Sequence, residues 1–140
     1  MLTGVGCDLI EIERVEKACE KEAFLLRVYT EEERRQADGR VSVLAGTFAV
    51  KEAVAKVLGT GFRTFMPKDV EVLRDELGKP YVILHENARN VADEKKIKRI
   101  EVSISDTKEF VMAFAVGEGD VLEKSGKWQR NESNGYAFDP

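Results

Sequence analysis

Hydrophobic and polar positions alternate at the start of the chain and then change to a helical spacing. The alternation over residues 2–10 predicts a strand, and apolar positions that recur every three or four residues predict a helix over 12–26. Thr30, with Glu33 three residues later, forms a capping-box pattern that predicts a second helix over residues 31–37. The first quarter of the chain is therefore one strand followed by two helices.

A long apolar helix is predicted in the middle of the chain, over residues 43–58. It ends at Gly59, a residue type that the carboxyl ends of helices favour. The next segments predict two strands, a helix and two more strands, over residues 70–74, 80–84, 87–96, 99–105 and 110–116. Because the strands come as adjacent pairs, we expect an α+β domain whose mainly antiparallel sheet packs with the long central helix.

Length and composition fit one compact domain with a separate tail. The chain has 140 residues, 43% of them hydrophobic, which is enough apolar material for one core. We assign residues 1–118 to this domain. Residues 119–140 are polar and lack a period, so we expect a disordered or loosely docked tail that Trp128 could anchor to a neighbour.

Charge and cysteine content exclude several classes of protein. The net charge is -4, so no overall positive field attracts nucleic acid. Cys7 and Cys19 make neither a disulfide framework nor a metal-binding pair, which favours a reduced, cytoplasmic protein. No stretch approaches the roughly 18 apolar residues of a membrane span, so we expect no membrane association.

Two acidic residues stand where local structure does not require them. In the first strand, Gly6 and Asp8 share one face, which predicts room for a ligand beside the carboxylate. In the long helix, Glu52 and Lys56 are one turn apart and project together from one surface.

These two segments resemble motifs of the holo-acyl-carrier-protein synthase type of phosphopantetheinyl transferase. The opening of that family is similar to Gly-x-Gly-x-Asp with a later arginine, and its central helix to Phe-Ala-x-Lys-Glu-Ala-x-x-Lys followed by Gly-Thr-Gly. The matching residues here are Gly4, Gly6, Asp8, Arg14, Phe48 through Lys56, and Gly59-Thr60-Gly61. Further matches are Tyr29-Thr30-Glu31-x-Glu33, Gly78-Lys79-Pro80 and Ser103-Ile104-Ser105, so the resemblance runs from Met1 to about Val116.

The resemblance implies transfer of the phosphopantetheine arm of coenzyme A to a serine of an acyl carrier protein, releasing adenosine 3′,5′-bisphosphate, in support of fatty acid biosynthesis. Two carboxylates with phosphate oxygens and water suit Mg²⁺, so Asp8 and Glu52 are the expected metal ligands. Glu52 would take the serine proton, and Lys56 would stabilise the leaving phosphate. The residues expected to bind coenzyme A are Lys51, Lys56, Gly59, Thr60, Gly61, Ser105 and Asp106.

Two positions depart from the family pattern and weaken the expected phosphate contacts. Thr47 stands where the family commonly has arginine, and Asp106 where it commonly has histidine. The 3′-phosphate would then be bound less tightly, or by Lys51, Lys108 or a neighbouring subunit. His85 is the only histidine and is interpreted as structural, which excludes histidine triads and histidine-cluster metal sites.

Partner contacts are expected on two surfaces. Arg14, Lys17 and Lys21 lie at helical spacing and form a basic patch for an acidic carrier protein. The last two strands carry apolar residues on both faces, with Val111, Ala113 and Ala115 opposite Phe110, Met112 and Phe114. Burial of the second set against other subunits fits the homotrimer, with active sites between subunits, that the resemblance implies.

The charged residues of the two motifs also allow purely structural roles. Asp8 could cap the following helix, and Glu52 with Lys56 could be a surface pair worth only about 0.3–0.5 kcal/mol. A catalytically weakened module that binds coenzyme A or the carrier, and a Mg²⁺-dependent nucleotide phosphohydrolase, are the alternative functions.

Overall fold

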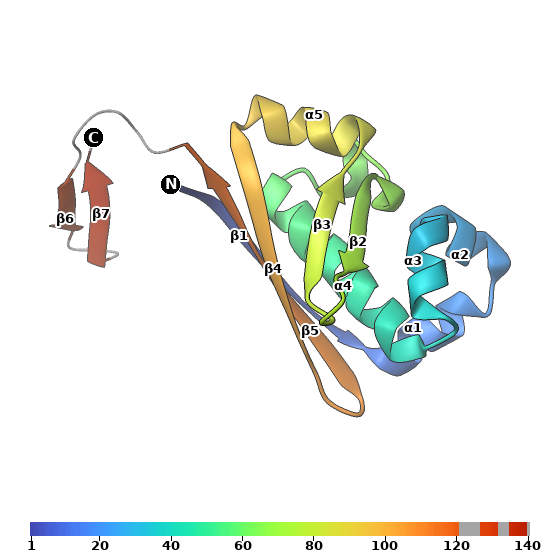
Figure 1. The fold of residues 1–140 in the computed structure, drawn as a ribbon. Helices are drawn as coiled ribbons and strands as arrows, with labels where there is room; N and C mark the ends of the chain where they lie inside the picture. Colours follow the sequence, from blue (N-terminus) through green and yellow to red (C-terminus); the bar gives the residue numbers. More distant parts are fainter. Residues whose placement is uncertain (121–126, 132–134, 140) are drawn as a thin grey trace.

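The computed structural model describes residues 1–120, 127–131 and 135–139 (Figure 1). The elements, in chain order, are β1 Leu2–Glu11, α1 Ile12–Cys19, α2 Glu22–Val28, α3 Glu31–Ala37, α4 Val41–Leu58, η1 Gly61–Arg63, η2 Pro67–Asp69, β2 Val70–Arg74, β3 Pro80–Leu84, α5 Glu86–Glu94, β4 Ile97–Asp106, β5 Phe110–Gly119, β6 Lys127–Asn131 and β7 Gly135–Asp139. None of the described helices is long and apolar enough to cross a membrane.

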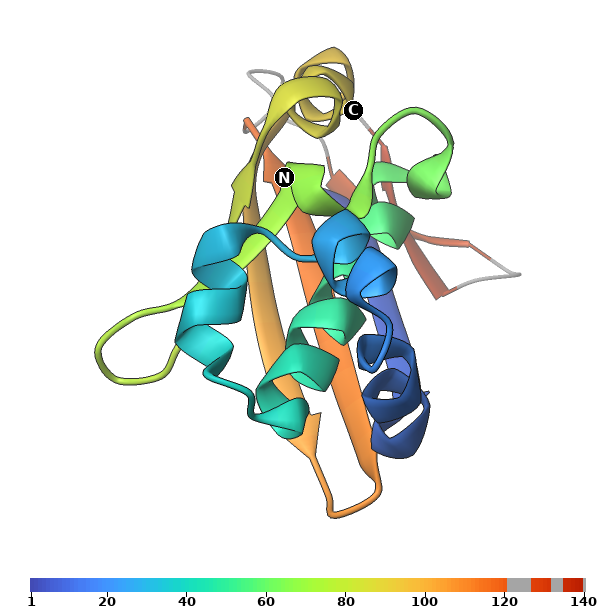
Figure 2. The ribbon, with the colours of Figure 1, turned by 90° about the vertical axis from the view of Figure 1, so that its right-hand side faces the viewer.

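Antiparallel pairing organises the strands, as the sequence predicts. The largest sheet has the order β1-β5-β4, so the amino-terminal strand pairs with β5 rather than with a neighbour in sequence. Strands β2 and β3 form an antiparallel pair, and so do β6 and β7. Helix α4 covers one face of the three-stranded sheet, and α1, α2 and α3 lie beside it (Figures 1 and 2). The α+β prediction is confirmed.

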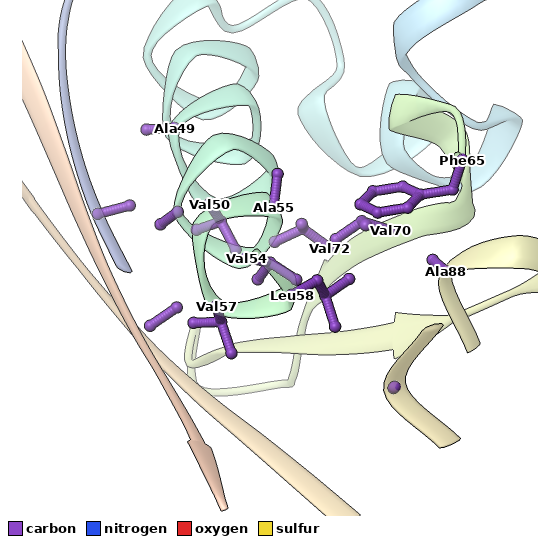
Figure 3. Packing of buried hydrophobic residues seen from close by; sticks show 14 of the residues in the cluster. Ala49, Val50, Val54, Ala55, Val57, Leu58, Phe65, Val70, Val72 and Ala88 are labelled. Atoms are coloured by element: carbon purple, nitrogen blue, oxygen red, sulfur yellow. The ribbon is translucent and has the colours of Figure 1, made fainter. Parts of the chain in front are cut away.

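Helix α4 lies between the sheet and the β2–β3 pair, and it supplies most of the core (Figure 3). Its residues Ala49, Val50, Val54 and Leu58 are almost without exposed surface, and they pack with Val70 and other apolar groups. A helix that is apolar nearly all round is typical of a buried position. The burial explains why this segment is the least polar helix of the chain.

Glycine lets strand β1 approach α4 closely. A Cβ added to Gly6 would lie only 2.0 Å from the carbonyl oxygen of Ala53 in α4. Any side chain at Gly6 would push the helix away from the sheet. The expectation that Gly6 leaves room for a ligand is therefore wrong, because the helix backbone fills that space.

The predicted single helix over residues 12–26 is divided into α1 and α2. Helix α1 ends at Cys19, and Lys21 has an extended backbone with φ -92° and ψ 117° before α2 begins at Glu22. The break lets Val15 of α1 enter the main core while Phe24 of α2 packs in a second cluster with Tyr29. Both segments keep a helical period, so the local pattern cannot show the break.

The capping box is confirmed at the start of α3. The N–H of Glu33 donates to Thr30 Oγ1 at 3.1 Å, and the N–H of Thr30 donates to Glu33 Oε1 at 2.7 Å. Strand β5 extends one residue past the predicted domain boundary at 118, to Gly119. Within the tail, β6 and β7 pair with each other. The disordered or loosely docked tail over residues 119–140 stays a prediction, and residues 121–126, 132–134 and 140 lie outside the described residues.

The outer face of the three-stranded sheet carries exposed apolar side chains. Side chains alternate along β5, so Val111, Ala113 and Ala115 are buried against α4 while Phe110, Met112 and Phe114 are 40–44% exposed. Val5 and Leu9 of β1 extend this apolar face, with 58% and 66% exposure. The two sets predicted on β5 therefore lie on opposite faces of the sheet.

Candidate active site

Asp8 and Lys56 meet at the junction of β1 with α4. Lys56 Nζ donates a hydrogen bond of 2.7 Å to the carbonyl of Cys7 and lies 3.4 Å from Asp8 Oδ1. The Asp8 side chain is 22% exposed and the Lys56 side chain 55% exposed. A ligand can therefore reach the charged ends of both side chains.

Glu52 lies one turn before Lys56 on α4 and completes this group of charges. Burial raises the pKa of the Glu52 carboxyl; the negative charge of Asp8 raises it further, and Lys56 opposes the rise. Two carboxylates that repel each other in a half-buried place attract a cation. No group of three or more potential metal ligands occurs in the described part of the chain, so a metal there needs oxygen ligands from elsewhere.

A cleft of roughly 560 Å³ opens beside these carboxylates. Asp8 and Glu52 line it together with Arg14 of α1 and the aromatic residues Phe24, Phe48 and Phe110. The position of the aromatic residues carries no signal in the sequence, because they come from three elements that only the fold brings together. Charged and apolar side chains thus line the same cleft, as they commonly do in ligand sites.

Lys51 lies inside the protein, although it is next to Glu52 in sequence. Its side chain has no exposed surface; Nζ lies 2.9 Å from Glu33 Oε2 and donates to the carbonyl oxygens of Pro67 and Val70. Burial lowers the pKa of Lys51, and the charge of Glu33 opposes that shift. The structure gives coenzyme A no access to this ammonium group. The prediction that Lys51 binds a phosphate is therefore not supported.

The glycine-rich segment follows the site along α4. Gly59 ends the helix in a left-handed conformation with φ 77°, and Gly61 also has a positive φ of 59°. Gly59 is seven positions after Glu52 along the helix, or roughly 10 Å. Gly59, Thr60 and Gly61 therefore lie within the reach of an extended ligand bound at Glu52 and Lys56.

Ser105 and Asp8 lie on opposite faces of the sheet within one chain. Asp8 pairs with Ala113, and Ala113 pairs with Ile104, so these three residues form one row across the sheet. Ser105 is the next residue on β4 and points to the opposite face, beside the exposed Met112. Asp106 pairs with Val111, whose side chain is buried against α4, so Asp106 lies on the same face as Asp8 but on the other outer strand of the sheet.

The basic patch is less regular than the sequence predicts. Arg14 lines the cleft, and Lys17 is exposed with its Nζ 3.3 Å from Glu13. Lys21 belongs to the break between α1 and α2, so its helical spacing from the other two is wrong. His85 precedes α5, with its Nε2 3.1 Å from Glu71 Oε1, which agrees with a structural role.

Comparison with known proteins identifies the family. Residues 4–115 match the model of the 4′-phosphopantetheinyl transferase superfamily. The chain belongs to this superfamily. It is 52% identical over 118 residues to the holo-[acyl-carrier-protein] synthase of Lachnoclostridium phytofermentans, a match that covers 84% of this chain and 97% of the relative.

Solved structures of the same family share the fold. The holo-[acyl-carrier-protein] synthase of Neisseria meningitidis has a TM-score of 0.77 and 34% identity, covering 84% of this chain and 99% of the other. The Bacillus anthracis synthase, in complex with CoA (3′,5′-ADP), has a TM-score of 0.71 and 36% identity, with coverages of 86% and 99%. The predicted family and fold are confirmed, and the chain is a phosphopantetheinyl transferase.

Proposed function

We propose that this protein transfers the 4′-phosphopantetheine group of coenzyme A to a serine of an apo-acyl carrier protein, with Mg²⁺ as cofactor. The observation that supports the proposal most is that Asp8 and Glu52 line one cleft, with Lys56 paired to Asp8, in a chain of this superfamily. The product would be a holo-carrier protein for fatty acid biosynthesis. Residence in the cytoplasm stays a prediction, compatible with the free thiols of Cys7 and Cys19.

The residues present fit a magnesium ion. Asp8 and Glu52 are two carboxylates that repel each other, and Mg²⁺ prefers a few carboxylate ligands completed by water and substrate phosphates. Asp8 and Glu52 would hold the ion, which when bound offsets negative charge on the pyrophosphate of coenzyme A.

The protein groups divide the remaining tasks of the transfer. Glu52 would accept the proton of the carrier serine, and its raised pKa suits a general base better than an ordinary carboxylate. The serine oxygen forms a bond to the phosphorus that carries the pantetheine, and the bond from that phosphorus to the bridging oxygen breaks. Lys56 would stabilise the charge that develops on the departing adenosine 3′,5′-bisphosphate.

One experiment tests this function against its alternatives. An apo-carrier protein is incubated with coenzyme A, Mg²⁺ and this protein, and the masses of the carrier and the nucleotide are then measured. A transferase adds one phosphopantetheine to the carrier and consumes coenzyme A only when the carrier is present. A phosphohydrolase cleaves coenzyme A alone, and a binding module leaves both unchanged. Either of the last two results overturns the proposal.

The apolar outer face of the sheet supports assembly into a homotrimer with active sites between subunits. Val5, Leu9, Met112 and Phe114 form an exposed apolar surface of the kind that marks protein contacts. Burial of this face against other copies would also place Ser105, which lies on it beside Met112, at the contact between subunits. Light scattering should give about three times 15.7 kDa, and Phe114→Asp should reduce that mass. A fully active monomer would contradict the shared site.

A further inference from the structure

The guanidinium group of Arg74 lies beside Thr47, twenty-seven residues away in sequence. Arg74 is the last residue of β2, and its Nη1 donates to Thr47 Oγ1 at 2.5 Å while its Nη2 lies 3.4 Å from the carbonyl oxygen of Val43. Gln36 of α3 fixes the backbone of Arg74, accepting from its N–H at 2.8 Å and donating to its carbonyl at 3.1 Å. The backbone and the guanidinium group of Arg74 are therefore both held in place before a ligand binds, which lowers the entropic cost of binding one.

Arg74 and Arg40 line a common cleft of roughly 390 Å³ between α3, the start of α4 and the β2–β3 connection. In the described part of the chain, the arginines that pair with carboxylates are Arg35 and Arg99. Arg40 instead donates to the carbonyl oxygens of Gln36 and Ala37. Burial lowers the pKa of Arg74; Glu33 opposes this shift, and the positive charge of Arg40 adds to it. An anion in this cleft would relieve the repulsion between the two arginines.

Hydrogen-bond donors on Arg74 are left for such an anion. A guanidinium group has five N–H donors, and among the described residues two of those on Arg74 have acceptors, on Thr47 and Val43. Among the described residues, the buried side-chain nitrogen without a partner is Arg34 Nε, so the unpartnered Nε of Arg74 is not fully buried. A planar guanidinium with free donors matches the oxygens of a phosphate group better than an ammonium does.

The acids of the same cleft set the direction of approach. Asp75 accepts the N–H groups of Leu77 and Lys79 with one carboxylate oxygen, which shapes the turn between β2 and β3. Glu76 also lines the cleft and would repel an anion. A ligand phosphate therefore has to enter on the side of Arg40 and Arg74, away from Glu76.

We propose that Arg74, assisted by Arg40, binds a phosphate monoester, and that in this enzyme the monoester is the 3′-phosphate of coenzyme A. The choice of ligand rests on the proposed function. Thr47 stands where the family commonly has arginine, and the structure shows a guanidinium group at that place, supplied by strand β2. Lys51 is enclosed by the core, so Arg74 takes the role for which Lys51 was a candidate.

The arginine cleft and the carboxylates lie on different sides of α4. Thr47 lies five residues before Glu52 on α4, which at 100° per residue turns it about 140° around the helix axis. The arginine cleft and the carboxylates thus face different sides of α4 in one chain. In the proposed homotrimer, one coenzyme A would therefore contact the arginines of one subunit and Asp8 and Glu52 of the next.

The test is calorimetric titration with coenzyme A and with dephospho-coenzyme A, which lacks the 3′-phosphate. The full chain should bind coenzyme A about tenfold or more tightly than dephospho-coenzyme A. Arg74→Gln should remove most of this preference and leave the affinity for dephospho-coenzyme A unchanged. Arg35→Gln, an exposed arginine on α3, is the matched control and should keep the preference. An unchanged preference in Arg74→Gln, or an equal loss for both ligands, overturns the proposal.

Two further variants separate recognition from folding. The double variant Thr47→Arg, Arg74→Gln should regain the preference for coenzyme A, because arginine at 47 can reach the space that Arg74 occupied. If Arg74→Gln does not fold, Arg74→Lys and Arg40→Gln replace it, and each should reduce the preference severalfold. Full preference in both of these overturns the proposal.

The outcomes for this proposal and for the proposed function can be distinguished. If the carrier is modified but Arg74→Gln keeps the full preference, the function stands and the arginine site is wrong. If the carrier is not modified, titration with adenosine 3′,5′-bisphosphate still tests the site. Binding that Arg74→Gln weakens about tenfold supports the phosphate site alone, and binding that it leaves unchanged overturns the site.

Discussion

Two neighbouring residues of helix α4, Lys51 and Glu52, belong to two different clusters of charged side chains. Lys51 is enclosed by the core, with Glu33 and two carbonyl oxygens around its ammonium group. Glu52, the next residue, lines an open cleft with Asp8, and Lys56 lies beside Asp8. A rotation of about 100° between consecutive helical residues separates the two environments.

The difference shows how placement decides what a charge does. The buried group has its charges balanced and its donors satisfied, so removing one partner leaves the other unpaired at a high cost. The open group has an excess of carboxylates, one with a raised pKa. Its uncompensated negative charge is therefore unfavourable until a cation or a substrate binds. We therefore expect mutations of the first group to affect stability and mutations of the second to affect activity.

The largest expected effect is on transfer. Asp8→Ala or Glu52→Ala should lower the rate of carrier modification by about a thousandfold or more, because each removes a carboxylate that helps to fix the ion and Glu52 also takes the proton. Mass spectrometry of the carrier at saturating Mg²⁺ measures the rate. Glu94→Ala, an exposed acid on α5, is the control and should be fully active. Near-normal transfer by Asp8→Ala or Glu52→Ala would remove the metal site.

The next effect concerns the buried pair. Lys51→Met should lower the free energy of unfolding by about 3–5 kcal/mol, because the carboxylate of Glu33 is then buried without its cation. Urea unfolding measures the change. Lys56→Met should alter stability by no more than about 1 kcal/mol, since more than half of the Lys56 side chain is exposed to solvent, which screens its charge. Adding Glu33→Gln to Lys51→Met should restore part of the loss. Equal losses for the two lysines would contradict the comparison.

A smaller effect is expected from the charges around the cleft entrance. Charge reversal at Arg14 and Lys21 together should raise the KM for an acidic carrier by about tenfold while leaving coenzyme A binding intact. Lys17→Glu should contribute less, because Glu13 already offsets Lys17. The exposed Lys98 provides a charge-reversal control. A KM and a salt dependence that do not change would show that the patch is only a solvated surface.

The smallest effect is on the pH dependence of stability without Mg²⁺. The pKa of Glu52 is higher in the folded protein than its ordinary value, so the folded state binds this proton more tightly. The resulting stabilisation is fully present below the ordinary pKa and is lost as the pH rises through the raised one. Glu52→Gln should therefore be more stable than the wild type at neutral pH, by less than about 1 kcal/mol, because the group is half exposed.

Urea unfolding at several pH values, with and without Mg²⁺, measures this difference. Addition of Mg²⁺ should stabilise the wild type and leave Glu52→Gln nearly unchanged, which reverses the order of the two proteins. A wild type that is the more stable protein at neutral pH without Mg²⁺ would contradict the unfavourable placement of Glu52.

Local patterns in the chain were sufficient to predict the elements and the main chemical groups. Periodicity located α3 and the core of α4 closely, because a capping box and an apolar helix are local features. It also placed Asp8 and Glu52 on the correct faces of a strand and a helix, and the order of the motifs identified the family.

The way those elements face one another depends on contacts between distant parts of the chain. The break at Lys21 follows from two clusters that receive α1 and α2 separately, and Gly6 serves the contact with α4 rather than a ligand. The burial of Lys51 and the meeting of Arg74 with Thr47 each require residues distant in sequence. A local pattern shows the face on which a side chain lies, but the packing of the whole chain sets what that face meets.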